Sequence, residues 1–143
     1  AEVRLESRLA GRTSGPDIET EGCSWVSAGP ALMRDGRILD DYEAESPKFG
    51  PAFALKRHPR TAVGIREDGT LLFVVVDGRQ DGLSAGMTLP ELAAFLEQRG
   101  AHDAYNLDGG GSSTMIVNGE IVNSPSDEQG ERPSSDAVVI RSH

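Results

Sequence analysis

In the stretch AYNLDGGGSSTMIVNG, residues 104–119, the carboxylate of Asp108 precedes three consecutive glycines and the three aliphatic hydroxyls of residues 112–114 follow them. Glycine loses more conformational freedom on folding than any other residue, so three in a row need a reason. Apolar residues on both sides predict buried strands rather than a flexible linker. Glycine N–H groups can approach an anion or a sugar hydroxyl closely, because no Cβ atom intervenes. We interpret Gly109, Gly110 and Gly111 as a ligand-binding loop; the alternative is a tight bend between strands that binds nothing.

The better-known glycine-loop chemistries do not fit this stretch. A phosphate-binding P-loop needs a lysine after the glycines and a helix that begins there, and the sequence continues with hydroxyl-bearing, β-branched and apolar residues instead. A nucleophile elbow needs a second glycine two residues after the serine, which Ser112 lacks. The three histidines are scattered and Cys23 is the single cysteine, so no zinc motif or disulfide pair is present, and we interpret each histidine as a surface residue.

The elements that must position this loop can be predicted from periodicity and turn signals. Strand 61–66, a turn at Asp68-Gly69 and strand 71–76 form a hairpin, and the second strand is apolar on both faces, which predicts a central position in its sheet. Thr88 and Glu91 have the spacing of a capping box and Gly100 follows the end of the apolar pattern, which predicts a helix over 89–99. A short strand over 103–107 comes next, so the strand–helix–strand order predicts a parallel crossover.

Further elements complete an α+β fold: a mixed β-sheet with one parallel β-α-β crossover and several hairpins, and the helix packed on the sheet. Residues 2–9 alternate like a half-buried strand, and residues 40–52 are acidic and proline-containing, like a surface loop. Hairpins are predicted at Asp35-Gly36 and at Asn118-Gly119, the second beginning with strand 113–117. A last strand is predicted over 136–141.

This element order brings polar residues from five segments to one edge of the sheet. Strands 71–76 and 103–107 end there, strand 61–66 begins there, and the second hairpin returns there. Ligand clefts commonly lie outside the carboxyl ends of parallel strands. The residues delivered to this edge are Arg60 and Thr61; Asp77; Asn106 and Asp108; Ser112, Ser113 and Thr114; and Asp127, Glu131 and Arg132.

Composition limits the classes of partner. The chain of 143 residues has 23 acidic and 14 basic side chains, for a formal charge of −9. A nucleic-acid backbone or an anionic membrane surface is therefore not expected as the main partner. No apolar run is long enough to cross a bilayer. One domain over residues 1–143 is expected, and the sequence does not indicate an oligomeric state.

Several strings in the same order resemble the phosphodiester glycosidase family. They are SAGPALMRDGR, HPRTAVGI, LLFVVVDGR, GMTLPELAAFLEQRGAHDAYNLDGGGSSTMIVNG and NSPSDEQGERP, within residues 24–141. The resemblance implies a single family domain that lacks an upstream part of the module, with an upstream fragment as a partner. It also implies an extracellular or periplasmic location. The residues it carries over are Arg60, Thr61, Gly64, Asp77, Asn106, Asp108, Gly109, Gly110, Gly111, Ser112, Ser113, Glu131 and Arg132.

The resemblance implies hydrolysis of the glycosidic C1–O bond of a sugar-1-phosphodiester, releasing free sugar and a phosphate monoester. Such a site needs a positive clamp on phosphate and a carboxylate near C1. Arg60 and Arg132 suit the clamp, since guanidinium binds phosphate in a bidentate manner. Asp108 is the expected nucleophile or base, with Glu131 as its partner.

Other readings of these residues stay open. Asp77 either joins the catalytic group or only begins a turn. Arg60 either serves the site or pairs with a surface acid. Glu131 and Arg132 either serve the site or form a solvent-exposed pair in a loop. No cofactor is expected to be required, although Asp77 and Asp108 could share a divalent cation. The alternative functions are a metal-dependent phosphodiesterase that breaks the P–O bond and a non-catalytic glycan-binding module.

Overall fold

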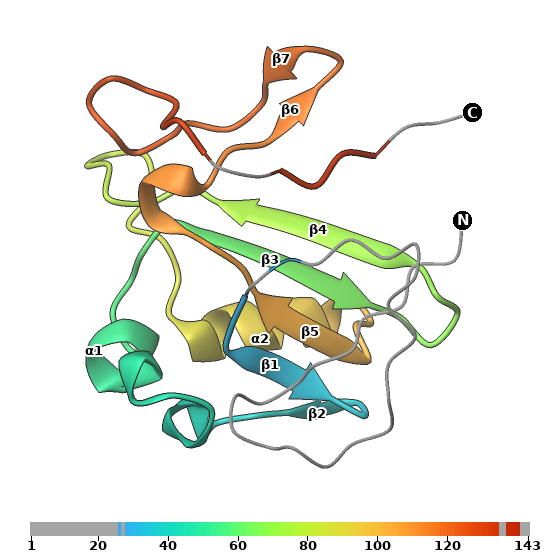
Figure 1. Cartoon of the computed structure of the whole chain (residues 1–143). Helices are drawn as coiled ribbons and strands as arrows, with labels where there is room; N and C mark the ends of the chain where they lie inside the picture. Colours follow the sequence, from blue (N-terminus) through green and yellow to red (C-terminus); the bar gives the residue numbers. More distant parts are fainter. Residues whose placement is uncertain (1–25, 27, 135–136, 141–143) are drawn as a thin grey trace.

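A five-stranded sheet with the order β2-β1-β5-β3-β4 organises the chain (Figure 1). The computed structural model describes residues 26, 28–134 and 137–140. The sheet strands are β1 (Ala31–Arg34), β2 (Arg37–Ile38), β3 (Arg60–Ile65), β4 (Leu71–Val76) and β5 (Asp103–Asn106). The α-helices are α1 (Pro51–Ala54) and α2 (Leu89–Gln98). Three short 3₁₀ helices are η1 (Tyr42–Ala44), η2 (Pro47–Phe49) and η3 (Gly110–Ser112). A separate two-stranded hairpin consists of β6 (Ile116–Val117) and β7 (Glu120–Ile121).

The α+β class is confirmed, but the strand order differs from the prediction. Neighbouring strands in the described sheet are antiparallel: β1 with β2, β1 with β5, β3 with β4, and β3 with β5. β4 and β5 run in the same direction only because both are antiparallel to β3, which lies between them. The predicted parallel pairing is therefore not confirmed, and β4 is an edge strand of the described sheet rather than a central one. The tight hairpin gives one edge of β3 to β4, so the chain returning from α2 pairs with the other edge.

Helix α2 forms as its sequence predicts and supplies the core. The Thr88 hydroxyl accepts the Glu91 N–H, and the Glu91 carboxylate accepts the Thr88 N–H, which completes the capping box. Leu89, Leu92 and Leu96 are fully buried in the main hydrophobic cluster. Burying each of these leucines contributes about 1.5–3 kcal/mol. The helix is in contact with β1, β2 and β5 and so holds the sheet on which the polar edge is built.

Two predicted hairpin turns are confirmed by their backbone angles. Asp35 and Gly36 have φ values of 50° and 71°, and Asn118 and Gly119 have 53° and 86°. Two successive positive φ values define the type I′ turn, whose twist matches that of antiparallel strands. These two local signals therefore determine the β1–β2 and β6–β7 hairpins.

Other predicted elements are corrected by the structure. Of the predicted strand 113–117 only Ile116 and Val117 are extended and paired, because the Ser113 N–H bonds the Gly110 carbonyl and the Met115 N–H bonds the Asn123 side chain. Residues 137–140 form no strand. The predicted loop 40–52 contains η1, η2 and the start of α1. The predicted strand 2–9 and Cys23 lie outside the described residues.

Among the described residues, no helix combines the length and the apolar character that a membrane-spanning segment requires.

Candidate active site

The polar edge predicted from element order lies where β4 and β5 end and β3 begins (Figure 1). Arg60 at the start of β3 is opposite Val76 at the end of β4, and Ala62 is opposite Asn106 at the end of β5. The glycine loop follows β5 at this edge. Strand pairing alone therefore brings three of the five predicted segments together.

The glycine loop is held against the segment that precedes β3. The Gly110 N–H donates to the Pro59 carbonyl at 2.9 Å, and Gly110 has a φ of +62°, where glycine is favoured. A Cβ atom at Gly109 would lie 2.9 Å from the same carbonyl oxygen. The loop then tightens into η3, with the Ser112 N–H bonded to the Gly109 carbonyl. The bare backbone is thus needed for close chain approach at Gly109 and for a left-handed residue at Gly110.

Arg79 lies directly over the loop. A Cβ atom at Gly110 would be 3.3 Å from Nη1 and 3.5 Å from Nη2 of Arg79. Arg79 itself has a φ of +57°, a conformation that costs a non-glycine residue about 1–2 kcal/mol. Unlike Asp35 and Asn118, it is not part of a type I′ hairpin turn. A strained residue that places a guanidinium over a glycine loop is a candidate functional residue.

A second guanidinium lies over the next glycine. Nε of Arg132 donates to Oδ2 of Asp127 at 2.8 Å. A Cβ atom at Gly111 would lie 2.3 Å from Oδ1 of Asp127 and 2.5 Å from Nη2 of Arg132. No side chain fits there without displacing this ion pair. The 109–111 loop is therefore bracketed by two arginines, from the segment after β4 and from the segment after β7.

The His58 side chain is a hydrogen-bond partner of the Arg79 guanidinium. Its Nδ1 lies 3.0 Å from Nη2 of Arg79. Burial lowers the pKa of the His58 imidazole, and the charges of Arg60, Arg79 and Lys56 lower it further. The neutral ring accepts the Arg79 hydrogen bond at Nδ1 and carries its own proton on Nε2.

Arg60 does not face this edge, although sequence reasoning placed it in the clamp. It is 2% exposed, and its guanidinium donates to the carbonyls of Met87 (3.0 Å), Phe53 (2.7 Å) and Lys56 (3.0 Å). The group also lies 4.8 Å above the Phe53 ring. Burial, followed by the Arg79 charge, lowers the pKa of Arg60 to about 10, so it remains charged at neutral pH. This position supports a structural role and gives no support to contact with phosphate.

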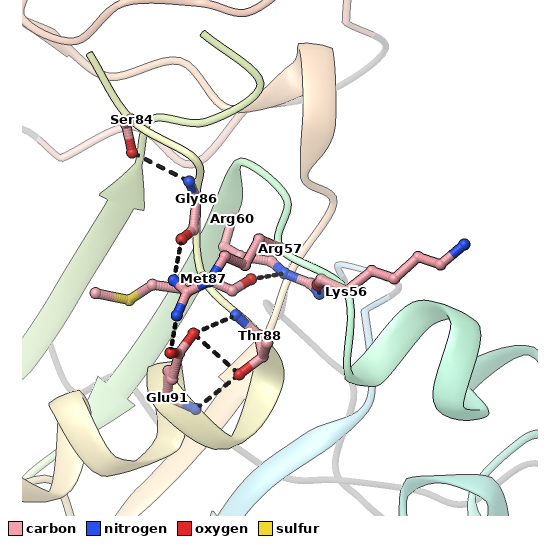
Figure 2. Close-up of polar contacts among 8 residues, drawn as sticks. All are labelled: Lys56, Arg57, Arg60, Ser84, Gly86, Met87, Thr88 and Glu91. Carbon is pink, nitrogen blue, oxygen red and sulfur yellow. Dashed lines mark hydrogen bonds and ion pairs between the residues drawn. The ribbon is translucent and has the colours of Figure 1, made fainter. Parts of the chain in front are cut away.

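The surroundings of Arg60 form a dense polar network around the start of α2 (Figure 2). Arg57 donates to the Gly86 carbonyl at 2.9 Å and pairs with Glu91 of the capping box. The Gly86 N–H in turn bonds the Ser84 hydroxyl at 3.1 Å. These contacts fix the 84–88 segment, which in turn holds His58 through paired backbone hydrogen bonds with Met87.

Four further predicted residues hold the loops in place. Asn106 is 2% exposed and its amide donates to the carbonyls of Gly29 and Leu107. Oδ1 of Asp77 accepts from the Asn123 amide at 3.0 Å and from the Ser124 N–H at 2.9 Å. Thr61 Oγ1 lies 3.2 Å from Oγ of the buried Ser113. Asp77 thus fastens the chain after β7 to the end of β4.

The remaining predicted residues are more accessible. Asp108 and Glu131 are exposed, and no hydrogen bond or ion pair joins either carboxylate to another described residue. Ser112 and Thr114 are half-buried on either side of Ser113. Asp108 directly precedes the glycine loop, so it is the carboxylate closest to the loop in the chain.

A cavity of about 470 Å³ opens beside Arg79. Its lining combines two arginines with the loop that follows β4: Arg57, Arg79, Gln80, Asp81, Gly82, Leu83, Ser84 and Ala85. A volume of this size is in the range of small-molecule sites. Arg79 therefore stands between the glycine loop and a space that could hold part of a ligand.

Sequence reasoning missed Arg79 and His58. Both lie within strings that carry the family resemblance, DGR after β4 and HPR before β3. The signal that could have found them is their position in the chain, because each adjoins a strand end at this edge. The sequence predicts His58 to be an isolated surface histidine, because its contact with Arg79 forms only when the fold brings residues 21 positions apart together.

Known proteins resemble this chain over most of its length. A family model described as phosphodiester glycosidase matches residues 5–141. The N-acetylglucosamine-1-phosphodiester alpha-N-acetylglucosaminidase of Mus musculus is 44% identical over 107 residues, which are 74% of this chain and 20% of that protein. The chain thus spans about a fifth of the length of this relative.

Solved structures show the same likeness. The catalytic domain of the zebrafish enzyme of that name, auto-inhibited by its pro-peptide, superposes with a TM-score of 0.57 at 32% identity, over 76% of this chain and 36% of that one. A putative exported protein from Burkholderia pseudomallei K96243 gives a TM-score of 0.52 at 55% identity, over 53% of this chain and 14% of that one. With the family model matched across 5–141, this chain belongs to the phosphodiester glycosidase family.

Proposed function

We propose that this chain carries a phosphodiester glycosidase site that hydrolyses the C1–O bond of a sugar-1-phosphodiester. The observation that carries the proposal is the glycine loop bracketed by Arg79 and Arg132, with the exposed Asp108 beside it. Family membership supplies the reaction class. Because the chain spans 36% of the zebrafish catalytic domain, activity of the chain by itself is part of the proposal.

The two arginines suit a bound phosphodiester. A diester carries one negative charge on two free oxygens, and a guanidinium can donate two parallel hydrogen bonds to such a pair. The hydrogen bond from Nη2 to His58 holds the Arg79 guanidinium beside the loop. Arg132 is held by Asp127 in the same way. In this proposal Arg79 and Arg132 replace the Arg60–Arg132 clamp expected from the sequence.

The carboxylates then divide into two roles. Asp108 acts at C1 as the nucleophile or as the base that activates water, and Glu131 is the second carboxylate of the pair. Asp77 has two donors on one oxygen and acts as a positioning residue for the chain after β7. The phosphate monoester leaves without strong acid assistance because it is already a stable anion.

The bond that breaks is the decisive test. An N-acetylglucosamine-1-phosphodiester is hydrolysed in ¹⁸O-labelled water, and the phosphate monoester is analysed by mass spectrometry. We expect unlabelled phosphate, because water attacks C1 and the phosphate keeps its own oxygens. The phosphate is the product to read, since a free sugar exchanges its C1 oxygen with water.

Two results would replace the proposal. Label on phosphate would mean attack at phosphorus and favour the phosphodiesterase alternative. Binding of the diester without any product would favour the glycan-binding alternative.

We also propose that the protein acts outside the cytoplasm. The support for this location is the description of the Burkholderia relative as an exported protein.

The substitution Arg79→Gly is expected to separate activity from stability. The loss of a charged hydrogen bond to phosphate should lower kcat/KM for the diester by about tenfold to a hundredfold. The free energy of unfolding should stay level or rise, because glycine adopts a φ of +57° freely and this offsets the lost contact with His58. Steady-state kinetics and urea unfolding measure the two effects.

The matched control is Asn118→Gly, which also relieves a positive φ, of 53°, but lies in the β6–β7 turn. It should affect stability in the same direction and leave kcat/KM unchanged. An Arg79→Gly variant with wild-type kcat/KM would remove Arg79 from the phosphate site.

A further inference from the structure

In the described part of the chain, the two segments that carry Arg79 and Arg132 are not joined by strand pairing. Arg79 follows β4 of the five-stranded sheet, whereas Arg132 follows the β6–β7 hairpin, which forms a separate sheet. The loop after β4 and the segment after β7 nevertheless lie side by side near the glycine loop (Figure 1). Side-chain hydrogen bonds therefore set the position of one segment relative to the other.

Gln80, the residue directly after Arg79, makes a reciprocal pair of hydrogen bonds with Ser124. Its Nε2 donates to the Ser124 carbonyl at 2.7 Å, and its Oε1 accepts from the Ser124 hydroxyl at 2.8 Å. The same Nε2 lies 3.4 Å from the Gly78 carbonyl, so both amide protons have an acceptor. The Gln80 backbone also exchanges two hydrogen bonds with the Ser84 backbone, at 3.1 and 3.0 Å. Gln80 is thus fixed through its side chain and through its main chain.

The chain before Arg79 is attached to the same place. Oδ1 of Asp77 accepts from the Ser124 N–H at 2.9 Å and from the Asn123 amide at 3.0 Å. Arg79 therefore lies between two residues that are both bonded to Ser124. A non-glycine residue in the left-handed region persists only where its surroundings over-determine the backbone. The contacts of Asp77 and Gln80 supply this constraint for the φ of +57° at Arg79.

Asn123 extends the connection to the glycine loop. Its Nδ2 also donates to the Ser113 carbonyl at 2.9 Å, and its Oδ1 accepts from the Met115 N–H at 2.8 Å. The Ser113 N–H in turn donates to the Gly110 carbonyl at 3.1 Å. The neighbouring Ser124 is therefore a fixed point relative to the loop that Arg79 covers.

We propose that Gln80 is a positioning residue for the phosphate clamp, and that it holds Arg79 in place relative to the glycine loop through its two hydrogen bonds to Ser124. This role rests on the function proposed above, in which Arg79 binds the phosphodiester. Gln80 is uncharged, so its removal leaves the charge of the site unchanged. A guanidinium that is free to move is correctly placed for only part of the time, and the apparent affinity for phosphate falls by that fraction.

A double-mutant cycle between Gln80 and Arg79 tests the proposal. Gln80→Ala should lower kcat/KM for an N-acetylglucosamine-1-phosphodiester by about threefold to tenfold when Arg79 is present. In the Arg79→Gly background the same substitution should change kcat/KM by less than about twofold, because no guanidinium is left to position. A purely structural role of Gln80 would lower kcat/KM by the same factor in both backgrounds.

Milder substitutions and a matched control accompany the cycle. Ser124→Ala removes only the hydroxyl and should lower kcat/KM by about twofold to threefold, again only when Arg79 is present. Ser124→Thr keeps a hydroxyl and should behave like wild type. Gln98→Ala makes the same change as Gln80→Ala at an exposed position at the end of α2, and should leave kcat/KM unchanged. Circular dichroism and thermal unfolding establish that each variant is folded.

The outcomes separate this proposal from the proposed reaction. Equal effects of Gln80→Ala in the two backgrounds, or no effect in the folded variant, would overturn the positioning role. The cycle does not depend on which bond breaks, so ¹⁸O label on phosphate would refute the glycosidase reaction alone. If the diester is bound without turnover, its dissociation constant from calorimetry replaces kcat/KM in the same cycle. A wild type that neither binds nor hydrolyses the diester would overturn the proposed function and the positioning role together.

Discussion

Asp108→Asn is expected to lower kcat for a sugar-1-phosphodiester by about a thousandfold or more while the protein stays folded. Removal of a nucleophile or essential base typically costs an enzyme several orders of magnitude. The amide keeps the shape of the side chain but removes the negative charge that would stabilise or attack an oxocarbenium-like C1. Asp108 is exposed and unpaired among the described residues, so the fold should not depend on it. Single-turnover kinetics and thermal unfolding check both halves of the prediction.

The control is Asp81→Asn, which changes an exposed carboxylate in the cavity-lining loop and should leave kcat within a few-fold of wild type. A nucleophile and a base can then be distinguished by the anomer of the sugar that wild type first releases, read by NMR before mutarotation. Retention indicates a covalent glycosyl-enzyme intermediate and hence a nucleophile, whereas inversion indicates direct attack by water and hence a base. Retention of full kcat by Asp108→Asn would assign the reaction at C1 to another carboxylate, with Glu131 as the next candidate.

Gly86→Ala is expected to lower the free energy of unfolding by about 3–5 kcal/mol. Gly86 has a φ of +91°, and a Cβ atom there would lie 2.3 Å from the His58 carbonyl oxygen and 2.5 Å from its carbonyl carbon. The neighbouring atoms are backbone, so they cannot rotate away. The strand-like pairing of His58 with Met87 would have to open, which would also move His58 away from Arg79. Urea unfolding gives the magnitude.

Gly69→Ala separates the steric cost from the backbone cost. Gly69 has a similar φ of +82°, and nothing lies within 4 Å of its Cβ position. Gly69→Ala should lower the free energy of unfolding by only about 1–2 kcal/mol, which is the cost of placing a non-glycine residue in a left-handed conformation. Equal decreases in the free energy of unfolding for Gly86→Ala and Gly69→Ala would show that contact between a Cβ atom at position 86 and the His58 backbone adds no cost beyond that of the backbone conformation.

Features specified by neighbouring residues could be predicted from the sequence. The capping box of α2 depends on Thr88 and Glu91, which are three positions apart, and the two type I′ turns depend on Asp-Gly and Asn-Gly pairs. Such interactions form within one turn of chain and do not wait for the rest of the fold. The polar edge was also predictable, because chain direction alone places the ends of β4 and β5 together.

Strand order could not be predicted in the same way. The apolar run in β4 predicts a central strand, yet β4 lies at one edge of the described sheet. Either edge of β3 offers the same row of backbone donors and acceptors. The partner of each edge depends on how α2 packs across the sheet, which involves residues distant in sequence.

The sequence by itself therefore determined the family, the helix cap, the hairpin turns and the position of the glycine loop. The tertiary structure alone decided which arginine meets that loop. Alternate residues of a strand face opposite sides of the sheet, so Arg60 points with Ala62 into the core beside α2, while Thr61 faces Ser113. Arg79 lies over Gly110 because its left-handed backbone turns the chain there. Side-chain direction depends on strand register and on backbone angles, which distant packing determines.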